Sequence, residues 1–180
     1  MSGLVGHRGM LLSVVPAVAA GFRYFRLVAP AGSIADSQWQ VGEFRIFDAA
    51  GVAYPQFTMT SNNTSDPASS TVVSANHILD DFYGPWRAFD RGATEAHNFP
   101  FIGDSSGGGM MYLQVDLGSA VSVVAAKFGV VPAWSSTNNA NALQFYGSKT
   151  GAFSGEQTLL ASYSNITGWV GDQEREFLVN

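Results

Sequence analysis

Apolar and polar residues alternate along much of this chain, which is the pattern of half-buried β-strands. The alternation is clearest at residues 22–28 (FRYFRLV), 39–47 (WQVGEFRIF) and 110–118 (MMYLQVDLG). Further strands are predicted at residues 71–75, 121–131, 143–146, 159–163 and 174–179. About eight short strands with frequent turn residues between them predict an all-β protein, an antiparallel β-sandwich of the jelly-roll kind.

Three stretches between these strands lack the alternation. Residues 58–70 (TMTSNNTSDPASS) are polar and rich in turn formers, so they are expected to be a loop. Residues 76–83 could form one helical turn with Asn76 as its cap. Residues 85–101 (PWRAFDRGATEAHNFPF) have no clear period and are also interpreted as a loop. No repeat or linker divides the chain, which predicts one sandwich domain over residues 22–180.

The first residues have a different character. The stretch GHRGMLLSVVPAVAAG (6–21) has a basic start, an apolar middle and small residues at its end, as a signal peptide does. However, Pro16 interrupts the apolar run, and the single basic residue, Arg8, sits late. The favoured interpretation is therefore a retained N-terminal arm over residues 1–21.

Apolar side chains in such an arm are costly to leave in water, so the arm is expected to be buried against another surface. That surface is either its own domain or, as we favour, a neighbouring subunit of a larger assembly. The predicted assembly residues are Leu4, Val5, Met10, Leu11, Leu12, Val14 and Val15.

The charge and composition of the chain exclude several classes of partner and site. The net charge is −5, and the only two lysines are Lys127 and Lys149. Because nucleic-acid binders show a basic stripe, we expect no nucleic-acid partner. The chain has no cysteine, which excludes disulfides and thiolate metal sites. No apolar run approaches the ~20 residues of a membrane-spanning helix, so no membrane insertion is expected.

Several phrases, in a consistent order, resemble one known superfamily. They are FRYFRLVAP, WQVGEFRIFD, WRAFDRGATEA, MMYLQVDLGSAVSV, LQFYGSKTGAFSG and GWVGDQEREFLV. Together they resemble the galactose-binding-like superfamily, also called discoidin or coagulation-factor C-type domains, over about residues 22–180. The early position of the first phrase is similar to virus-borne and prophage-borne members. The chain departs from the family at Asp90-Arg91-Gly92, where Asp-Gly-Asn is usual.

The resemblance implies one structural Ca²⁺ beneath that loop. Carried over by motif, the ligands would be the Asp90 side chain, the Arg87 and Gly92 carbonyls, an oxygen of Thr94, and the carboxylate of Glu43. Glu43 stands in an otherwise apolar and aromatic strand, where an unpaired carboxylate is expensive. The alternative is a salt bridge from Glu43 to Arg23, Arg26 or Arg45.

Sugar recognition needs an aromatic face with fixed polar groups beside it. The predicted loops offer this chemistry, and the ligand-binding candidates are Trp86, Arg91, His97, Asn98 and Trp134, with Tyr83 nearby. The alternative is that Trp86 and Trp134 plug the ends of the core. Trp39 and Trp169 lie in or beside strands and are expected to be core residues.

Catalytic motifs are weak. GDSSGGG (103–109) is similar to a protease nucleophile loop, but its extra serine breaks the spacing, so a flexible turn is expected. His7, His77 and His97 are scattered without metal-binding spacing. No catalytic residue is therefore predicted.

These features predict a non-enzymatic virion protein: a component of a bacteriophage tail, fibre or head decoration. Its partners would be other virion proteins, further copies of itself in a homo-oligomer, and a host-surface glycan. The alternatives are a free secreted carbohydrate-binding module, with residues 1 to about 20 as signal peptide, and a glycoside-cleaving enzyme.

Overall fold

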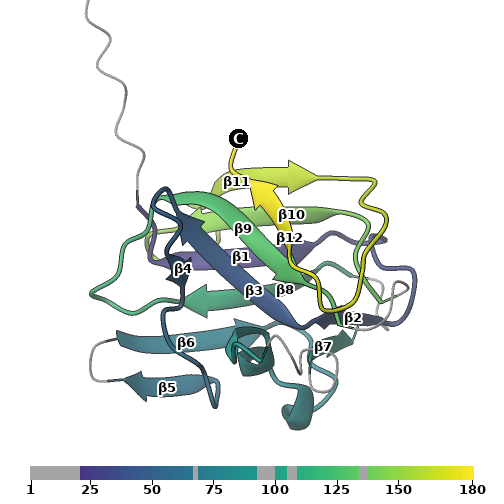
Figure 1. Ribbon diagram of the computed structural model, residues 1–180, viewed down its shortest axis with the longest axis horizontal. Helices are drawn as coiled ribbons and strands as arrows, with labels where there is room; N and C mark the ends of the chain where they lie inside the picture. Colours follow the sequence, from purple (N-terminus) through teal and green to yellow (C-terminus); the bar gives the residue numbers. More distant parts are fainter. Residues whose placement is uncertain (1–20, 67–68, 93–99, 105–108, 134–137) are drawn as a thin grey trace, which may run out of the picture.

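The computed structural model describes residues 21–66, 69–92, 100–104, 109–133 and 138–180 and shows an antiparallel β-sandwich (Figure 1). The strands are β1 (Tyr24–Ala29), β2 (Gln38–Val41), β3 (Glu43–Asp48), β4 (Ala53–Tyr54), β5 (Asn63–Asp66), β6 (Ser69–Ala75), β7 (Phe101–Asp104), β8 (Met111–Asp116), β9 (Ala125–Val131), β10 (Leu143–Ser148), β11 (Thr158–Tyr163) and β12 (Arg175–Leu178). Two short 3₁₀ helices, η1 (Asp81–Tyr83) and η2 (Pro85–Phe89), lie between β6 and β7.

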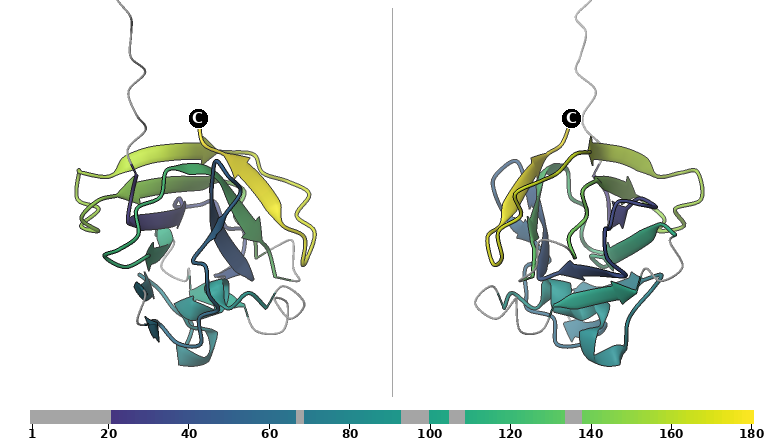
Figure 2. Two further views of the ribbon diagram at one scale, coloured as in Figure 1. Left: turned by 60° about the vertical axis from the view of Figure 1, so that its left-hand side comes forward. Right: turned by 90° about the vertical axis from the view of Figure 1, so that its right-hand side faces the viewer.

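The strands form two main layers. The larger sheet has the order β11-β10-β1-β8-β6-β5, and the smaller one has the order β12-β9-β3-β4. A third, two-stranded sheet joins β2 to β7. All the strand pairs in the described residues are antiparallel, and the views in Figure 2 show the layers from two further sides. The prediction of an all-β antiparallel sandwich is confirmed, and the jelly-roll connectivity stays a prediction.

Aromatic side chains join the two layers. Phe145 of β10 stacks on Phe128 of β9 with ring centres 4.6 Å apart, and Phe128 also stacks on Phe44 of β3. Phe25 of β1 meets the edge of Phe128 from the larger sheet. All four side chains are at most 1% exposed. In β1, β8 and β10 the alternation of the sequence therefore places every second residue in this shared core.

Residues 39–47 do not form one strand as predicted. The chain changes sheets at Gly42, so β2 pairs with β7 while β3 pairs with β9 and β4. The Gly42 N–H donates to the Val131 carbonyl at 2.8 Å. Both halves are largely buried, so their side-chain pattern runs on across the break and conceals it.

The loop predicted over residues 58–70 is also wrong in part, because Asn63–Asp66 forms β5 and pairs with β6. An edge strand needs only backbone hydrogen bonds on one side, which polar residues provide as well as apolar ones.

The helical turn is shorter than expected and has a different cap. Asp80 caps η1 by accepting hydrogen bonds from the N–H groups of Phe82 and Tyr83. Asn76, the predicted cap, instead bonds to the backbone of Met110 and Tyr112. The stretch interpreted as a loop over residues 85–101 begins with η2 and ends at the start of β7.

The described chain enters the sandwich at Phe22, which forms a bridge to Val123. The C-terminal Asn180 lies at the same end of the molecule, and η1 and η2 lie at the opposite end (Figures 1 and 2). The predicted assembly residues between Leu4 and Val15 lie outside the described residues. Within the described part, no helix is long and apolar enough to cross a bilayer.

Candidate functional site

The turn that follows η2 is held by its own side chains. Arg91 adopts a left-handed backbone conformation, with φ of 56°, which is unusual for a residue with a Cβ. The Gly92 N–H donates to Asp90 Oδ1 at 2.9 Å, and Arg91 Nη2 donates to the Pro55 carbonyl at 2.8 Å. These bonds fix the turn against the segment that follows β4.

Glu43, at the start of β3, is the most unusual side chain of this region. It is 1% exposed, and neither of its carboxylate oxygens accepts a hydrogen bond from a donor in the described residues. Its nearest cation is Arg45, whose Nε lies 3.7 Å from Glu43 Oε2. Burial raises the pKa of Glu43 to about 8; Arg45 and Arg91 oppose this, and the neighbouring carboxyl of Asp90 adds to it.

The fold thus brings Glu43 of β3 next to Asp90, which is 47 positions away in the sequence. The negative charge of the Asp90 carboxyl adds to the rise in the pKa of Glu43. Two ionised carboxylates only accept hydrogen bonds, so they cannot satisfy one another. Asp90 Oδ2 also lies 4.0 Å from Nη1 of Arg87. The pair therefore needs either a shared proton or a cation between its oxygens.

Four of the five predicted metal ligands belong to this neighbourhood. Asp90 lies near enough to Glu43 to raise its pKa, while Arg87 and Gly92 lie three residues before and two residues after Asp90. The fifth, Thr94, lies outside the described residues. The salt-bridge alternative also has a partner in Arg45, whereas Arg23 pairs with Asp116 and Arg26 bonds to Gln114.

The chemistry of these groups fits a calcium ion in one respect and competes with it in another. A buried carboxylate without a hydrogen-bond donor is the oxygen ligand that Ca²⁺ requires. Arg45, Arg87 and Arg91 meanwhile bring positive charge to the same carboxyl groups. The described residues contain no cluster of three or more acidic or histidine side chains, so backbone carbonyls would have to complete the shell.

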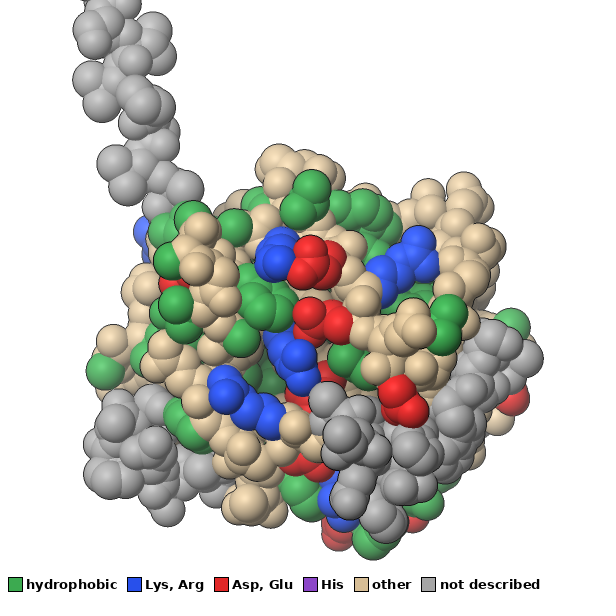
Figure 3. Space-filling view, viewed as in Figure 1, with side chains coloured by type: hydrophobic (Ala, Val, Ile, Leu, Met, Phe, Trp, Pro, Cys, Tyr) green, Lys and Arg blue, Asp and Glu red, His purple; other side chains and the backbone are tan. Residues whose placement is uncertain are grey.

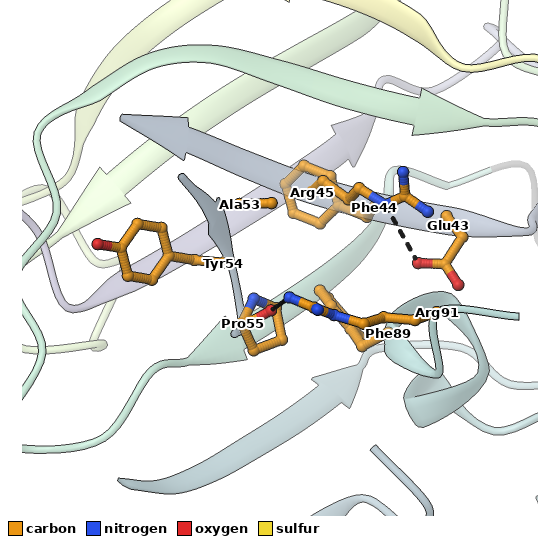
Figure 4. Close-up of a pocket in the computed structure, with 8 residues that line it drawn as sticks. All are labelled: Glu43, Phe44, Arg45, Ala53, Tyr54, Pro55, Phe89 and Arg91. Carbon is orange, nitrogen blue, oxygen red and sulfur yellow. Dashed lines mark hydrogen bonds and ion pairs between the residues drawn. The ribbon is translucent and has the colours of Figure 1, made fainter. Parts of the chain in front are cut away.

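A cavity of about 240 Å³ opens beside Glu43. Figure 4 shows Glu43 and Arg45 on β3 facing Arg91 across it, with Tyr54 and Pro55 on the side of β4. Phe44 and Phe89 also line it. The cavity therefore combines aromatic walls with one buried acid and two guanidinium groups.

The predicted sugar-binding residues are only partly described. His97, Asn98 and Trp134 lie outside the described residues. Arg91 is exposed, and Trp86 is half-buried with part of its ring packed on the core. Trp86 and Arg91 come from opposite ends of η2.

Exposed aromatic groups gather around Trp86, and we call Phe82, Tyr83, Trp86 and Arg87 the distal cluster. The Arg87 guanidinium lies 4.0 Å from the Trp86 ring centre and 5.1 Å from that of Phe82. Phe82 and Tyr83 meet edge to face at 5.0 Å, and Phe82 is 51% exposed. Ile78 and Leu79, both exposed, precede this cluster.

A second aromatic site was missed in the sequence. Trp169, expected to be a core residue, packs on the core with one side but also lines a surface hollow with Arg175. The available signal was the pair of glycines at 168 and 171, because a tryptophan between turn glycines is placed at the surface more readily than one inside a strand.

No family model, no curated protein and no solved structure matches this chain. The galactose-binding-like resemblance therefore stays a prediction. The serines of the GDSSGGG stretch also lie outside the described residues.

Proposed function

We propose that this chain is a non-enzymatic structural and adhesion protein of a virion, attached through residues 1–21 and presenting its sandwich to glycans on a host surface. The virion proposal rests on the apolar character of residues 4–15 and on the order of the family-like phrases. Further virion proteins and copies of this chain would be its partners.

The placement of the two ends carries this proposal. The described chain begins at the same end of the molecule as the C-terminus, while the distal cluster lies on η1 and η2 at the opposite end (Figure 1). A domain tethered at the first end directs the second end outward. An exposed aromatic surface held by a fixed guanidinium group is the kind of surface that stacks against sugar rings.

We further propose that Glu43 and Asp90 hold one structural Ca²⁺, with carbonyl oxygens of the η2 turn completing its shell. The ion would supply positive charge that lets both carboxylates ionise. Asp90 would then tie the turn after η2 to Glu43 on β3, which orients the distal cluster.

Adhesion is tested by applying the full chain to a glycan array and analysing the bound glycans for cleavage. We expect binding without cleavage products, and we expect Phe82→Ala to weaken the binding about fivefold, since one aromatic contact contributes about 1 kcal/mol. Leu159→Ala is the matched control, because Leu159 is equally exposed but lies on β11. Equal binding by both variants, or cleaved glycan, would refute the proposal.

Attachment is tested by removing residues 1–20. We expect a folded β-sandwich that no longer joins its assembly, measured by circular dichroism and by sedimentation with the particle. An unfolded product would show that these residues belong to the core. Mass spectrometry of the native protein addresses the secreted alternative, because a mature chain starting near Ala20 would support it.

A further inference from the structure

A second hollow, of about 440 Å³, lies on the molecule beside β12 and is lined by residues 167–170 and 173–176. Trp169 forms part of its wall. The indole Nε1–H donates to the Ala140 carbonyl at 3.0 Å, and the ring packs against Phe177 with centres 6.1 Å apart. The orientation of this half-buried indole is therefore set by the fold and not by a ligand.

The charged side chains around Trp169 are held in place as well. Arg175 Nη1 donates to the Thr167 carbonyl at 2.7 Å, and its guanidinium lies 5.4 Å from the Trp169 ring centre. Glu174 accepts a hydrogen bond from Arg45 at 3.1 Å, and Glu176 pairs with Lys127. A guanidinium has five N–H groups and a carboxylate has about four acceptor positions, so each retains capacity for a ligand.

The position of Glu174 depends on a glycine of the neighbouring strand. Gly129 of β9 pairs with Glu176 of β12, and a Cβ on Gly129 would lie 2.6 Å from Glu174 Oε2. The absence of a side chain at residue 129 thus leaves room for the Glu174 carboxylate to reach Arg45 across the sheet. The arrangement of charged groups in the hollow therefore depends on Gly129 of the smaller sheet.

The acidic side chains that line the hollow are neutralised by neighbouring cations. Each of its acidic groups is paired with a cation, and Figure 3 shows basic and acidic side chains side by side over the smaller sheet. The hollow therefore offers no unpaired carboxylate to a cation, and the Arg175 guanidinium already donates to the Thr167 carbonyl. The hollow offers fixed donors and acceptors beside an aromatic ring, which suits an uncharged ligand with several hydroxyl groups.

We propose that this hollow binds a neutral pyranose unit of a glycan. The sugar lies against Trp169 and exchanges hydrogen bonds with Arg175, Glu174 and the exposed side chain of Gln173. The site is distinct from the distal cluster, which lies on η1 and η2. The inference therefore goes beyond the proposed function and stands on separate residues.

The test is a titration of the full chain with glucose, galactose, mannose or N-acetylglucosamine, followed by the tryptophan indole N–H signals in NMR spectra. We expect at least one of these sugars to shift the Trp169 signal, which is assigned from a Trp169→Phe variant, and to leave the buried Trp39 unchanged. Gln173→Ala should weaken this binding about fivefold to tenfold, the loss of one hydrogen bond. Gln56→Ala, which changes another exposed glutamine outside the hollow, should have no effect.

The outcomes separate this inference from the proposed function. If none of the four sugars shifts Trp169, the inference is overturned, while loss of array binding in Phe82→Ala would still support the distal cluster. If Gln173→Ala binds as well as the unchanged chain, the hollow is not the site. Stronger binding of the anionic sugar N-acetylneuraminic acid than of every neutral sugar would overturn the charge argument.

Discussion

The aromatic interior between the two sheets and the acidic corner at Glu43 are both buried, but they are built from opposite chemistry. Phe128 and Phe145 are fully buried and in contact, so their burial stabilises the sandwich. Glu43 is just as buried, yet its carboxylate lacks a hydrogen-bond donor among the described residues. Burial of this group opposes folding unless a proton or a cation neutralises it. Of the two regions, the acidic corner is the one whose residues are not explained by stability alone.

The largest effect is expected in the interior. Phe145→Ala removes a ring that contacts Phe128, Phe44 and Phe177, and it should lower the free energy of unfolding by about 3–5 kcal/mol. Urea denaturation measures this loss. Phe82→Ala, at an exposed ring, is the control and should cost about 1 kcal/mol or less. Similar losses in both variants would mean that the stacked rings do not dominate stability.

The next effect concerns pH in the metal-free protein. The pKa of Glu43 is about 8 in the folded chain against 4.5 as its ordinary value, so the folded state binds more protons between these two values. Stability from this group is therefore complete below pH 4.5, falls as pH rises, and is lost above pH 8. Since one pKa unit is about 1.4 kcal/mol, Glu43→Gln should be more stable than the unchanged chain by several kcal/mol at pH 8.5.

Glu156→Gln is the control for this pH dependence of stability. Hydrogen bonds to the Glu156 carboxyl, of which the one from Ser148 has the largest effect, lower its pKa. Glu156→Gln should therefore lose stability above pH 4.5, where Glu43→Gln gains it. Chelator-treated samples are followed by urea denaturation from pH 4 to 9. If the difference between Glu43→Gln and the unchanged chain stays constant over this range, Glu43 is not buried as a neutral acid.

Calcium should restore the folding stability that the metal-free chain loses at high pH. An ion bound between Glu43 and Asp90 stabilises only the folded chain, by about 2.7 kcal/mol at a concentration one hundred times its Kd. We expect calcium to raise the melting temperature of the unchanged chain at pH 8, and chelator to lower it. Glu43→Gln should respond to neither. An unchanged melting curve, with no metal found by elemental analysis, would leave the proton and the arginines as the partners of Glu43.

The difference between the two regions also explains what the sequence could predict. The strands that form the interior could be predicted because the apolar residues of a strand repeat at every second position, whichever sheet the strand joins. The change of sheets at Gly42 was hidden for the same reason. Glu43 stood out as the one acid in a buried strand, and Arg45 could have been selected as its partner, since residues two apart in a strand lie on one face.

Contacts between distant segments were harder to predict. Asp90 was found near Glu43 only through the family-like loop, because no local rule connects η2 with β3. The hollow at Trp169 depends on where the turn before β12 lies against Ala140 and β9, and that placement has no local sequence signal. The polar strand β5 was missed because backbone pairing at a sheet edge leaves little trace in side-chain pattern.

Arg91→Gly should have the smallest effect on stability. It should also test the acidic corner most directly, through its calcium affinity. Glycine relieves the left-handed backbone at this position by about 1 kcal/mol but loses the hydrogen bond to Pro55, which contributes about as much. The free energy of unfolding should therefore change by less than about 1 kcal/mol.

Calcium affinity should rise, because Arg91 brings positive charge to Glu43 and its removal leaves the two carboxylates less compensated. Titration calorimetry compares the variant with Arg23→Gly, which removes a guanidinium that is paired with Asp116 instead. If neither variant changes calcium affinity, the positive charge of Arg91 does not compete for the carboxylates. The glycine that the resembled family usually has at position 91 would then have only a conformational role.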